Sequence, residues 1–235
     1  MPALSRMVLS DAVYSEIKDR IIKLQLAPGE SLSIDGLREE LGVSSTPIRE
    51  ALNRLSAENL VRLEPFKGFT VEPLLSHAQL TQLHEVRALI EMHAIRAGGD
   101  RLRDDKADAL DREIDVMERL LEREPFDVAA FNLADEEFHI QLVTAAENPV
   151  LERAYRSLNV HVQIARLFNR RGKDLGLAAN VEHRGIAAAL RAGDIEQAAT
   201  RAAHHIDGVV DRLRSIAGAA FSEKSARSGE RSDGP

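Results

Sequence analysis

The sequence predicts a mainly α-helical protein, and three observations carry this prediction. Apolar residues recur at the 3.6-residue period of a helix over most of the 235 residues. Aromatic residues make up only 4% of the chain within a hydrophobic content of 44%, so aliphatic side chains must fill the core. A short stretch at residues 60–71 alternates apolar and polar residues, as a β-hairpin does.

Three helices and the hairpin are predicted before residue 73. The helices cover residues 10–24, 33–41 and 44–59. Ser10 is the expected N-cap of the first, Gly42 supplies the left-handed residue that ends the second, and Pro47 lies in the first turn of the third. The hairpin turns at Lys67-Gly68. This order of elements is the plan of a winged helix-turn-helix, which we place at residues 8–73.

An all-α six-helix bundle is predicted for residues 76–217. Pro73 opens a short linker at 73–76, and Gly, Pro and Asn residues divide the sequence that follows. The predicted helices cover residues 76–98, 104–123, 127–147, 149–171, 176–192 and 194–217. Residues 218–235 are rich in Ser, Gly and charge, so we expect a disordered tail.

Composition excludes several classes of protein. The sequence holds no cysteine, so disulfides and thiolate metal sites are excluded, and a metal must be held by His, Asp or Glu. The N-terminus lacks an apolar signal core, and no stretch of about 18 apolar residues exists. We therefore expect a cytoplasmic protein with no membrane contact.

Bulk charge argues mildly against a nucleic-acid partner. The net charge is −7, and residues 1–75 carry 9 Lys and Arg against 11 Asp and Glu. Charges far from the groove are screened over about 8–10 Å, so bulk charge is a weak test. DNA binding would depend on local placement of a few cations, namely Arg49, Arg54, Arg62 and Lys67.

The third helix is the candidate DNA reader. The first turns of such a helix meet base edges in the major groove, and a hairpin tip can touch the minor groove or the backbone. Arg49 is the strongest candidate because guanidinium pairs bidentately with guanine or clamps a phosphate. The alternative is that Arg49 is merely solvated on an amphipathic helix. The predicted DNA-contacting residues are Ser44, Ser45, Thr46, Arg49, Asn53, Lys67 and Gly68.

Four residues of the bundle have spacings that suit a metal site. Asp135 and His139 are four apart and share a helix face, while His183 and His205 stand at similar heights on two helices joined at Gly193-Asp194. Such a set suits a divalent metal such as zinc, nickel or manganese. Geometry leaves His204 open in place of His205. The remaining histidines, His77, His84, His93 and His161, we assign to ordinary surface or core positions.

The motifs of the first unit have a known counterpart. They are Pro28-Gly29, Leu37, Leu41-Gly42-Val43-Ser44, Thr46-Pro47-Ile48-Arg49-Glu50-Ala51-Leu52, Leu55, Glu58-Asn59-Leu60-Val61 and Gly68. This pattern resembles the GntR family of bacterial regulators. The resemblance implies a regulator that binds double-stranded operator DNA. Where Ser45 stands, the family usually carries Arg, which predicts an operator unlike the common half-site or weaker discrimination there.

The second unit carries a further resemblance. Its motifs are Arg87-x-x-x-Glu91, Asp135 to His139, Asn148-Pro149, Glu182-His183, Ile186, Ala189-Leu190, Gly193-Asp194, Ala198 and His205. They resemble the FCD ligand-binding domain of the FadR subfamily, in its shorter VanR-like form. The resemblance implies that Asp135, His139, His183 and His205 are the metal ligands, and it selects His205 over His204.

The FCD resemblance also implies a small organic acid as effector. A metal and a nearby arginine would stabilise such an anion. The candidate contacts are Arg87, Asn159, Gln163 and Arg166. For Arg87 the favoured interpretation is a structural ion pair with Glu91.

Together these inferences predict a ligand-responsive transcriptional repressor that acts as a homodimer on a palindromic operator. One alternative makes the metal purely structural. A second is a metal-dependent hydrolase with Glu136 or Glu137 as base, in which the DNA-binding unit would have no role. We therefore expect that the protein is not an enzyme.

Overall fold

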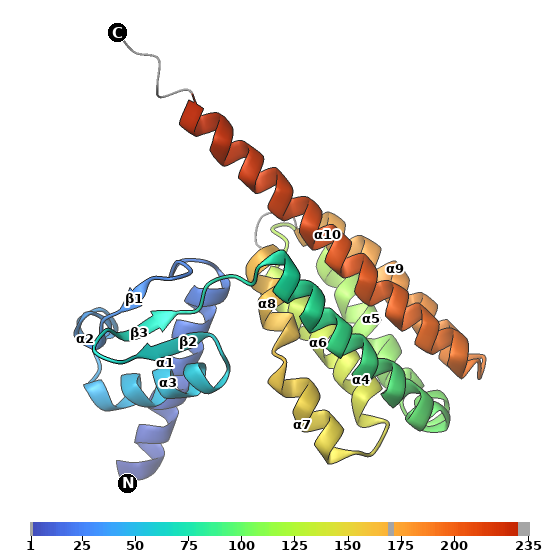
Figure 1. Ribbon diagram of the computed structural model, residues 1–235. Helices are drawn as coiled ribbons and strands as arrows, with labels where there is room; N and C mark the ends of the chain where they lie inside the picture. The colour runs from blue at the N-terminus through green and yellow to red at the C-terminus, as the bar shows by residue number, and fades with distance from the viewer. Residues whose placement is uncertain (1, 169–171, 230–235) are drawn as a thin grey trace. The chain divides into compact units, whose positions relative to one another are not determined.

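The computed structural model describes residues 2–168 and 172–229, and the chain divides into two compact units, Met1–Leu74 and Leu75–Pro235 (Figure 1). The division falls within the linker expected at 73–76. No helix among the described residues is both long enough and apolar enough to cross a membrane.

The first unit combines three helices with a small antiparallel sheet. Its elements are α1 (Pro2–Ile22), β1 (Ser31–Leu32), α2 (Ile34–Leu41), α3 (Ser45–Ala57), β2 (Val61–Glu64) and β3 (Gly68–Val71). The strand order is β1-β3-β2, and Phe69 of β3 pairs with Leu32 on one side and Leu63 on the other. The winged helix-turn-helix prediction is thereby confirmed, and β1 is a strand that the sequence pattern did not reveal.

The apolar face of α3 lies in the core of this unit. Ile48, Leu52 and Leu55 are completely buried, and α3 packs against α1. Helix α2 is capped at both ends, by Ser33 at its start and, as predicted, by Gly42 at its end. The Gly36 amide donates to Ser33 Oγ at 3.2 Å, and Gly42 has a φ of 65°.

The predicted start of the first helix is wrong. Ser10 is not an N-cap, because α1 begins at Pro2 and Ser10 lies buried within the helix. The residues before it include Ala3, Leu4 and Met7, which are strong helix formers, so the helix continues N-terminally past the capping signal.

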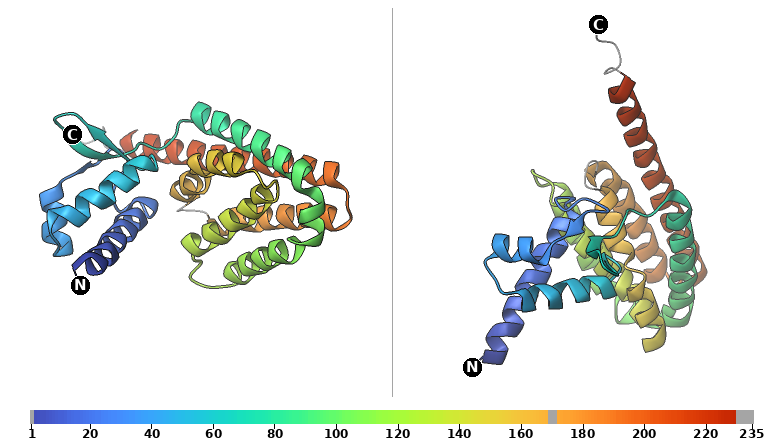
Figure 2. Two further views of the ribbon diagram at one scale, coloured as in Figure 1. Left: turned by 90° about the horizontal axis from the view of Figure 1, so that it is seen from below. Right: turned by 60° about the vertical axis from the view of Figure 1, so that its left-hand side comes forward.

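The second unit is an all-helical bundle, seen from three directions in Figures 1 and 2. Its elements are α4 (His77–Asp104), α5 (Ala107–Leu121), α6 (Val128–Thr144), α7 (Pro149–Ser157), α8 (Val160–Phe168), α9 (Gly172–Arg191) and α10 (Ile195–Gly229). Helix α10 packs along both α4 and α9, and α5 packs against α6 and α9. The largest apolar core lies among α4, α5, α6, α9 and α10.

The predicted helix end at Gly98-Gly99 is wrong, because α4 continues through both glycines to Asp104. A Cβ atom at Gly98 would lie 2.5 Å from the backbone carbonyl carbon of Ala145, and one at Gly99 would lie 2.7 Å from the Ile195 side chain. The two glycines thus allow neighbouring segments to approach α4 closely, and they do not stop the helix.

The predicted helix at 149–171 is two helices. Asn159 adopts a φ of 48°, which separates α7 from α8, and asparagine tolerates this left-handed conformation better than most residues. The described part of this unit therefore holds seven helices where six were predicted. Helix α10 extends to Gly229, so the disorder expected from residue 218 is not seen over 218–229, where Ala, Glu, Lys and Arg favour a helix. Residues 230–235 lie outside the described residues.

Candidate metal centre and DNA-contacting surface

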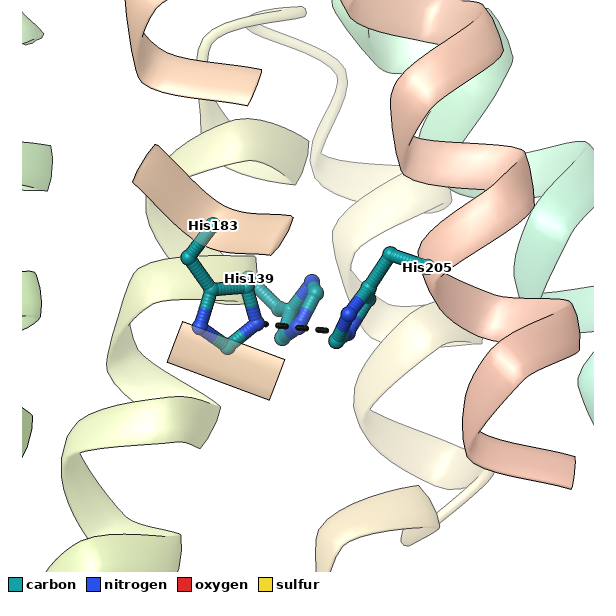
Figure 3. Close-up of side chains that lie close together, drawn as sticks. All are labelled: His139, His183 and His205. Carbon is teal, nitrogen blue, oxygen red and sulfur yellow. Dashed lines mark hydrogen bonds between the residues drawn. The ribbon is translucent and has the colours of Figure 1, made fainter. Parts of the chain in front are cut away.

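Side chains from three helices converge inside the second unit. Helix α6 supplies Asp135 and His139, α9 supplies His183 and α10 supplies His205. Figure 3 shows the three imidazole rings directed toward one another. His183 Nε2 lies 3.2 Å from His205 Nε2 and 3.4 Å from Asp135 Oδ1, and His139 Nε2 lies 3.9 Å from the same oxygen. Nitrogen atoms of the three histidines all fall within 4.8 Å of one another.

The cluster is buried. His139 and His183 are completely inaccessible, His205 is 1% exposed and Asp135 is 7% exposed. His204 is exposed, since the next position of a helix points about 100° away. It is therefore His205, and not His204, that faces the other three side chains.

A second layer of hydrogen bonds orients the cluster. His139 Nδ1 bonds Glu91 Oε2 at 2.8 Å, His205 Nδ1 bonds Glu182 Oε2 at 2.8 Å, and the Nδ1 atom of His161 bonds Asp135 Oδ2 at 2.9 Å. A carboxylate can only accept, so each Nδ1 must carry the proton, which leaves the Nε2 lone pairs of the first two rings free to bind a cation.

The electrostatic environment favours the deprotonated forms of these groups, which are the forms that bind a metal. Burial and the nearby Arg87 guanidinium hold the pKa of His139 well below its usual value, and burial beside His205 lowers the pKa of His183 to about 3. Burial alone would raise the pKa of Asp135, but the hydrogen bond from His161 and the surrounding imidazoles keep it well below its usual range. Near neutral pH the Asp135 carboxylate is thus charged and the imidazoles of His139 and His183 are neutral.

A buried polar network adjoins the centre. Arg87 donates from Nε to Glu91 Oε1 at 2.7 Å, as the predicted ion pair requires, and both side chains are completely buried. The Tyr155 hydroxyl donates to the same oxygen at 2.8 Å. Among the described residues, no hydrogen-bond partner is found for Nη1 or Nη2 of Arg87. Nη1 and Nη2 of Arg87 can therefore donate hydrogen bonds to a further anionic group.

The other three candidate effector contacts have different surroundings. Gln163 and Arg166 are buried on α8, where Arg166 Nη1 donates to Gln163 Oε1 at 3.4 Å. Asn159 stands at the break between α7 and α8, partly exposed, with its side-chain amide 3.5 Å from the Ser157 carbonyl. Its position accounts for the helix break.

The candidate DNA-contacting residues of α3 lie at or near the protein surface. Ser44 is the N-cap of the helix, with Ser45 and Thr46 partly exposed in the first turn. Arg49 and Asn53 are exposed on the following turns. Arg49 forms no ion pair with any residue in the described ranges, so its guanidinium is available to a phosphate or a base.

The other three cations predicted to contact DNA form ion pairs within the first unit. Arg54 pairs with Asp11 at 2.5 Å and lies 4.0 Å above the Tyr14 ring. On the hairpin, Glu64 pairs with both Arg62 and Lys67, at 2.8 and 3.1 Å. Of the four cations predicted to contact DNA, Arg49 is therefore the one without an ion pair in the described ranges. Lys67 in the β2–β3 turn and Gly68 at the start of β3 are exposed.

Comparison with known families now assigns both units. Residues 9–71 match the family described as "Bacterial regulatory proteins, gntR family", and residues 82–208 match the FCD domain. The chain belongs to the GntR family of bacterial regulators. Its relatives include the "Nta operon transcriptional regulator" of Aminobacter aminovorans, which is 31% identical over 86% of this chain and 93% of the relative. Another is the "Probable D-xylose utilization operon transcriptional repressor" of Paenarthrobacter nicotinovorans, 30% identical over 88% and 91%.

Solved structures of GntR regulators share the fold. Escherichia coli McbR/YncC superimposes with a TM-score of 0.70 over 88% of this chain and 97% of that chain, at 22% identity. A GntR transcriptional regulator from Rhodococcus sp. RHA1 gives 0.72 over 89% and 98%, at 23% identity. The protein is a DNA-binding transcriptional regulator and not an enzyme, so the hydrolase alternative is set aside.

Sequence reasoning missed three partners in the GntR regulator's buried centre. His161 was assigned to an ordinary position, yet it bonds Asp135, and Tyr155 and Glu182 were given no role. The adjacency of Glu182 to His183 was a signal for one of them. The remaining assignments fit: His77 and His93 are exposed, and His84 is buried with Nδ1 bonded to the Leu80 carbonyl.

Proposed function

We propose that this regulator senses a small organic acid at a divalent metal bound by Asp135, His139, His183 and His205. Zinc is the first candidate, with nickel and manganese as alternatives. The observation that carries the proposal is the convergence of three histidine side chains from α6, α9 and α10 (Figure 3). A carboxylate oxygen of Asp135 lies beside two of their Nε2 atoms. A donor set of histidine and aspartate suits these metals and needs no cysteine.

The distances fit such an ion. Zinc binds imidazole nitrogen and carboxylate oxygen at about 2.0–2.2 Å, so two ligand atoms at tetrahedral angles lie about 3.4 Å apart. The separations of 3.2, 3.4 and 3.9 Å between these atoms lie on either side of this value. In addition, His139 Nε2 is buried and has no hydrogen-bond partner among the described residues, an arrangement that a cation would satisfy.

An anionic ligand complements the charge of this centre. A bound divalent cation with open coordination positions supplies positive charge to which a carboxylate can bind. Arg87 supports the same chemistry, because its Nη atoms are buried and unbonded within the described part of the chain. Gln163 and Arg166 are also buried and can bind other polar groups of the acid.

The regulatory step is the change in DNA affinity that acid binding causes. We infer a homodimer that acts in the cytoplasm on a two-fold symmetric operator and represses transcription until the acid binds. The acid can shift DNA affinity only by its differential affinity for two arrangements of the protein. The linker at 73–76 is the element through which the helical unit can act on the DNA-binding unit.

Acid binding to metal-loaded and metal-free protein tests the proposal. Full-length protein is stripped with a chelator, half is reloaded with zinc, and both are titrated calorimetrically with acetate, lactate, malate, citrate and gluconate. We expect at least one acid to bind the zinc form and to lose at least about tenfold in affinity without zinc. Equal affinities in both forms, with metal removal lowering only the melting temperature, would instead make the metal structural.

A further inference from the structure

Two buried side chains of α4 carry polar atoms whose hydrogen-bonding capacity is not used within the described part of the chain. His84 is 2% exposed and Arg87 is completely buried. They stand three positions apart, so they are neighbours on one face of the helix. Nε2 of His84 and both Nη atoms of Arg87 have no hydrogen-bond partner in the described ranges. Because burying such atoms unpaired costs free energy, the pair indicates a site for a polar ligand.

The other ring nitrogen of His84 determines what Nε2 can bind. His84 Nδ1 lies 2.9 Å from the Leu80 carbonyl oxygen, which can only accept, so Nδ1 carries the proton. Burial and the nearby Arg87 guanidinium lower the pKa of His84 to about 4, so the ring is neutral near neutral pH. Nε2 is therefore a lone-pair acceptor, and the partner that it requires is a hydrogen-bond donor.

Arg87 has the opposite requirement. Its Nε donates to Glu91 Oε1 at 2.7 Å, and its two Nη atoms can only donate further hydrogen bonds. A carboxylate suits the paired donors of a guanidinium, because it accepts at two oxygens. The side chain also lies beside the candidate metal centre. Glu91 bonds His139 through its other oxygen, and burial together with the charge of Arg87 lowers the pKa of His139.

His84 is connected to the same centre. After burial and Arg87, the groups whose charges act on its pKa include Glu91 and His161. His161 Nδ1 in turn bonds Asp135 Oδ2 at 2.9 Å. The acceptor of His84 and the donors of Arg87 therefore belong to the polar region of the core that contains the candidate metal ligands.

We propose that the effector is a hydroxy acid, whose carboxylate accepts hydrogen bonds from the Nη atoms of Arg87 and whose hydroxyl donates to Nε2 of His84. This assignment rests on the proposed function, because it names the class of acid that binds at that centre. His84 and Arg87 are separated by about 4.5 Å along the helix axis, so the hydroxyl stands within a few carbon atoms of the carboxylate.

A hydroxyl fits the His84 position better than the alternatives. An acid with hydrogen in its place leaves Nε2 without a donor, and a site built to bind a hydroxyl discriminates against such an analogue. An ammonium group is also a donor, but it would lie near the positive charge of Arg87, which already opposes protonation of His84. The site therefore selects a neutral donor.

Matched acids test the proposal in zinc-loaded full-length protein. Three pairs differ only in the replacement of a hydroxyl by hydrogen: lactate and propionate, malate and succinate, and citrate and tricarballylate. Aspartate is the ammonium counterpart of malate. Calorimetry should show a hydroxy acid binding at least about tenfold more tightly than its counterparts. Equal or reversed affinities in the pairs that bind would overturn the hydroxy-acid assignment and leave the proposed function intact, whereas no binding by any of these acids would contradict both.

Substitution of His84 shows whether this residue causes the preference, since a hydroxyl can also bind the metal. His84→Phe keeps a buried ring but removes Nε2, so the preference should fall to within about twofold while the acid without a hydroxyl keeps its affinity. His84→Gln retains a side-chain oxygen that can accept, so it should keep part of the preference. His93→Phe, at an exposed position of the same helix, is the matched control and should keep all of it. A full preference in His84→Phe would overturn the proposal.

Two further measurements separate binding from folding. Ligand-free His84→Phe should melt no lower than wild type, because an apolar ring replaces a buried nitrogen without a partner in the described residues. Nitrogen-15 NMR of histidine-labelled wild type then reports on Nε2 directly, with its resonance assigned by comparison with either His84 variant. The resonance should move upfield with the hydroxy acid, as expected when a lone pair gains a donor, and not with its counterpart. An unchanged resonance in the hydroxy-acid complex would contradict the contact.

Discussion

His139 Nδ1 lies 2.8 Å from Glu91 Oε2, although the two residues are 48 positions apart on α6 and α4. Both side chains are completely buried. The other oxygen of Glu91 accepts hydrogen bonds from Arg87 and Tyr155, so the carboxylate cannot turn away from the ring. This contact fixes the tautomer of His139 and directs its Nε2 toward His183, His205 and Asp135.

Glu91→Gln should lower zinc affinity about 10- to 100-fold, because the second-layer carboxylate raises the basicity of its imidazole partner and orients it. The measurement is competition against a fluorescent zinc chelator at neutral pH, with helicity checked by circular dichroism. Glu182→Gln is the comparison. Glu182 is partly exposed, so water can replace part of its role toward His205, and the loss should be smaller. Equal affinities for Glu91→Gln and wild type would contradict the assigned role of Glu91.

The neighbouring histidines of α10 provide a matched pair of substitutions. His205→Ala removes a buried ring of the cluster, whereas His204→Ala removes an exposed ring from the same turn. We expect His205→Ala to lose zinc in elemental analysis of the purified protein and His204→Ala to retain one equivalent per chain. If both variants carried the full amount of zinc, α10 would supply no ligand.

Helical spacing predicted that Asp135, His139 and His183 meet one histidine of α10, because positions four apart on α6 share a face and α9 and α10 form a hairpin. Spacing left the choice between His204 and His205 open, and the family resemblance selected His205. The residues that hydrogen-bond to these ligands could not be predicted from the sequence. No local sequence pattern predicts that α4 packs against α6, so the contact between Glu91 and His139 could not be predicted. The same holds for His161, whose approach to Asp135 depends on the break at Asn159 that creates α8.

The missed element boundaries share a physical cause. Gly98-Gly99 has the local chemistry of a helix end, but close packing against Ala145 and Ile195 decides its conformation. Strand β1 is two residues long and exists through its pairing with β3. In both cases tertiary contacts override the local signal.

Gly98→Ala should lower the free energy of unfolding by about 3 kcal/mol, because the new Cβ meets backbone atoms that cannot rotate away. Gly185→Ala is the control within the same unit. There the nearest atom is the end of the flexible Arg201 side chain, at 2.9 Å, and alanine also favours the helix, so the change should stay within about 1 kcal/mol. Urea unfolding followed by circular dichroism measures both. Equal effects would mean that α4 and Ala145 are less closely packed than described.

His84 should make stability depend on pH. Burial and the nearby Arg87 lower its pKa to about 4 from a model-peptide value of about 6.5. The unfolded state therefore binds more protons between these values, so His84 contributes full stability above about pH 6.5 and loses it as pH falls toward 4. The upper limit is about 3 kcal/mol. Metal-free wild type should lose more stability over this window than metal-free His84→Gln, and parallel curves from urea unfolding would contradict the shift.

Arg49→Ala should weaken binding to a DNA duplex that the wild-type full-length protein has selected from a randomised pool. The expected loss is about 10- to 100-fold, because an exposed guanidinium without an ion-pair partner in the described residues can contact DNA. Arg54→Ala is the matched control from the same helix. Arg54 is engaged by Asp11 and Tyr14, so its loss should alter melting temperature more than DNA affinity. Fluorescence polarisation measures the affinities. Repeating the selection from the randomised pool with Arg49→Ala shows whether Arg49 contacts a base or a phosphate. Relaxed preference at one base pair indicates a base contact, uniform weakening with a smaller salt slope indicates a phosphate, and unchanged binding would remove Arg49 from the DNA-contacting surface.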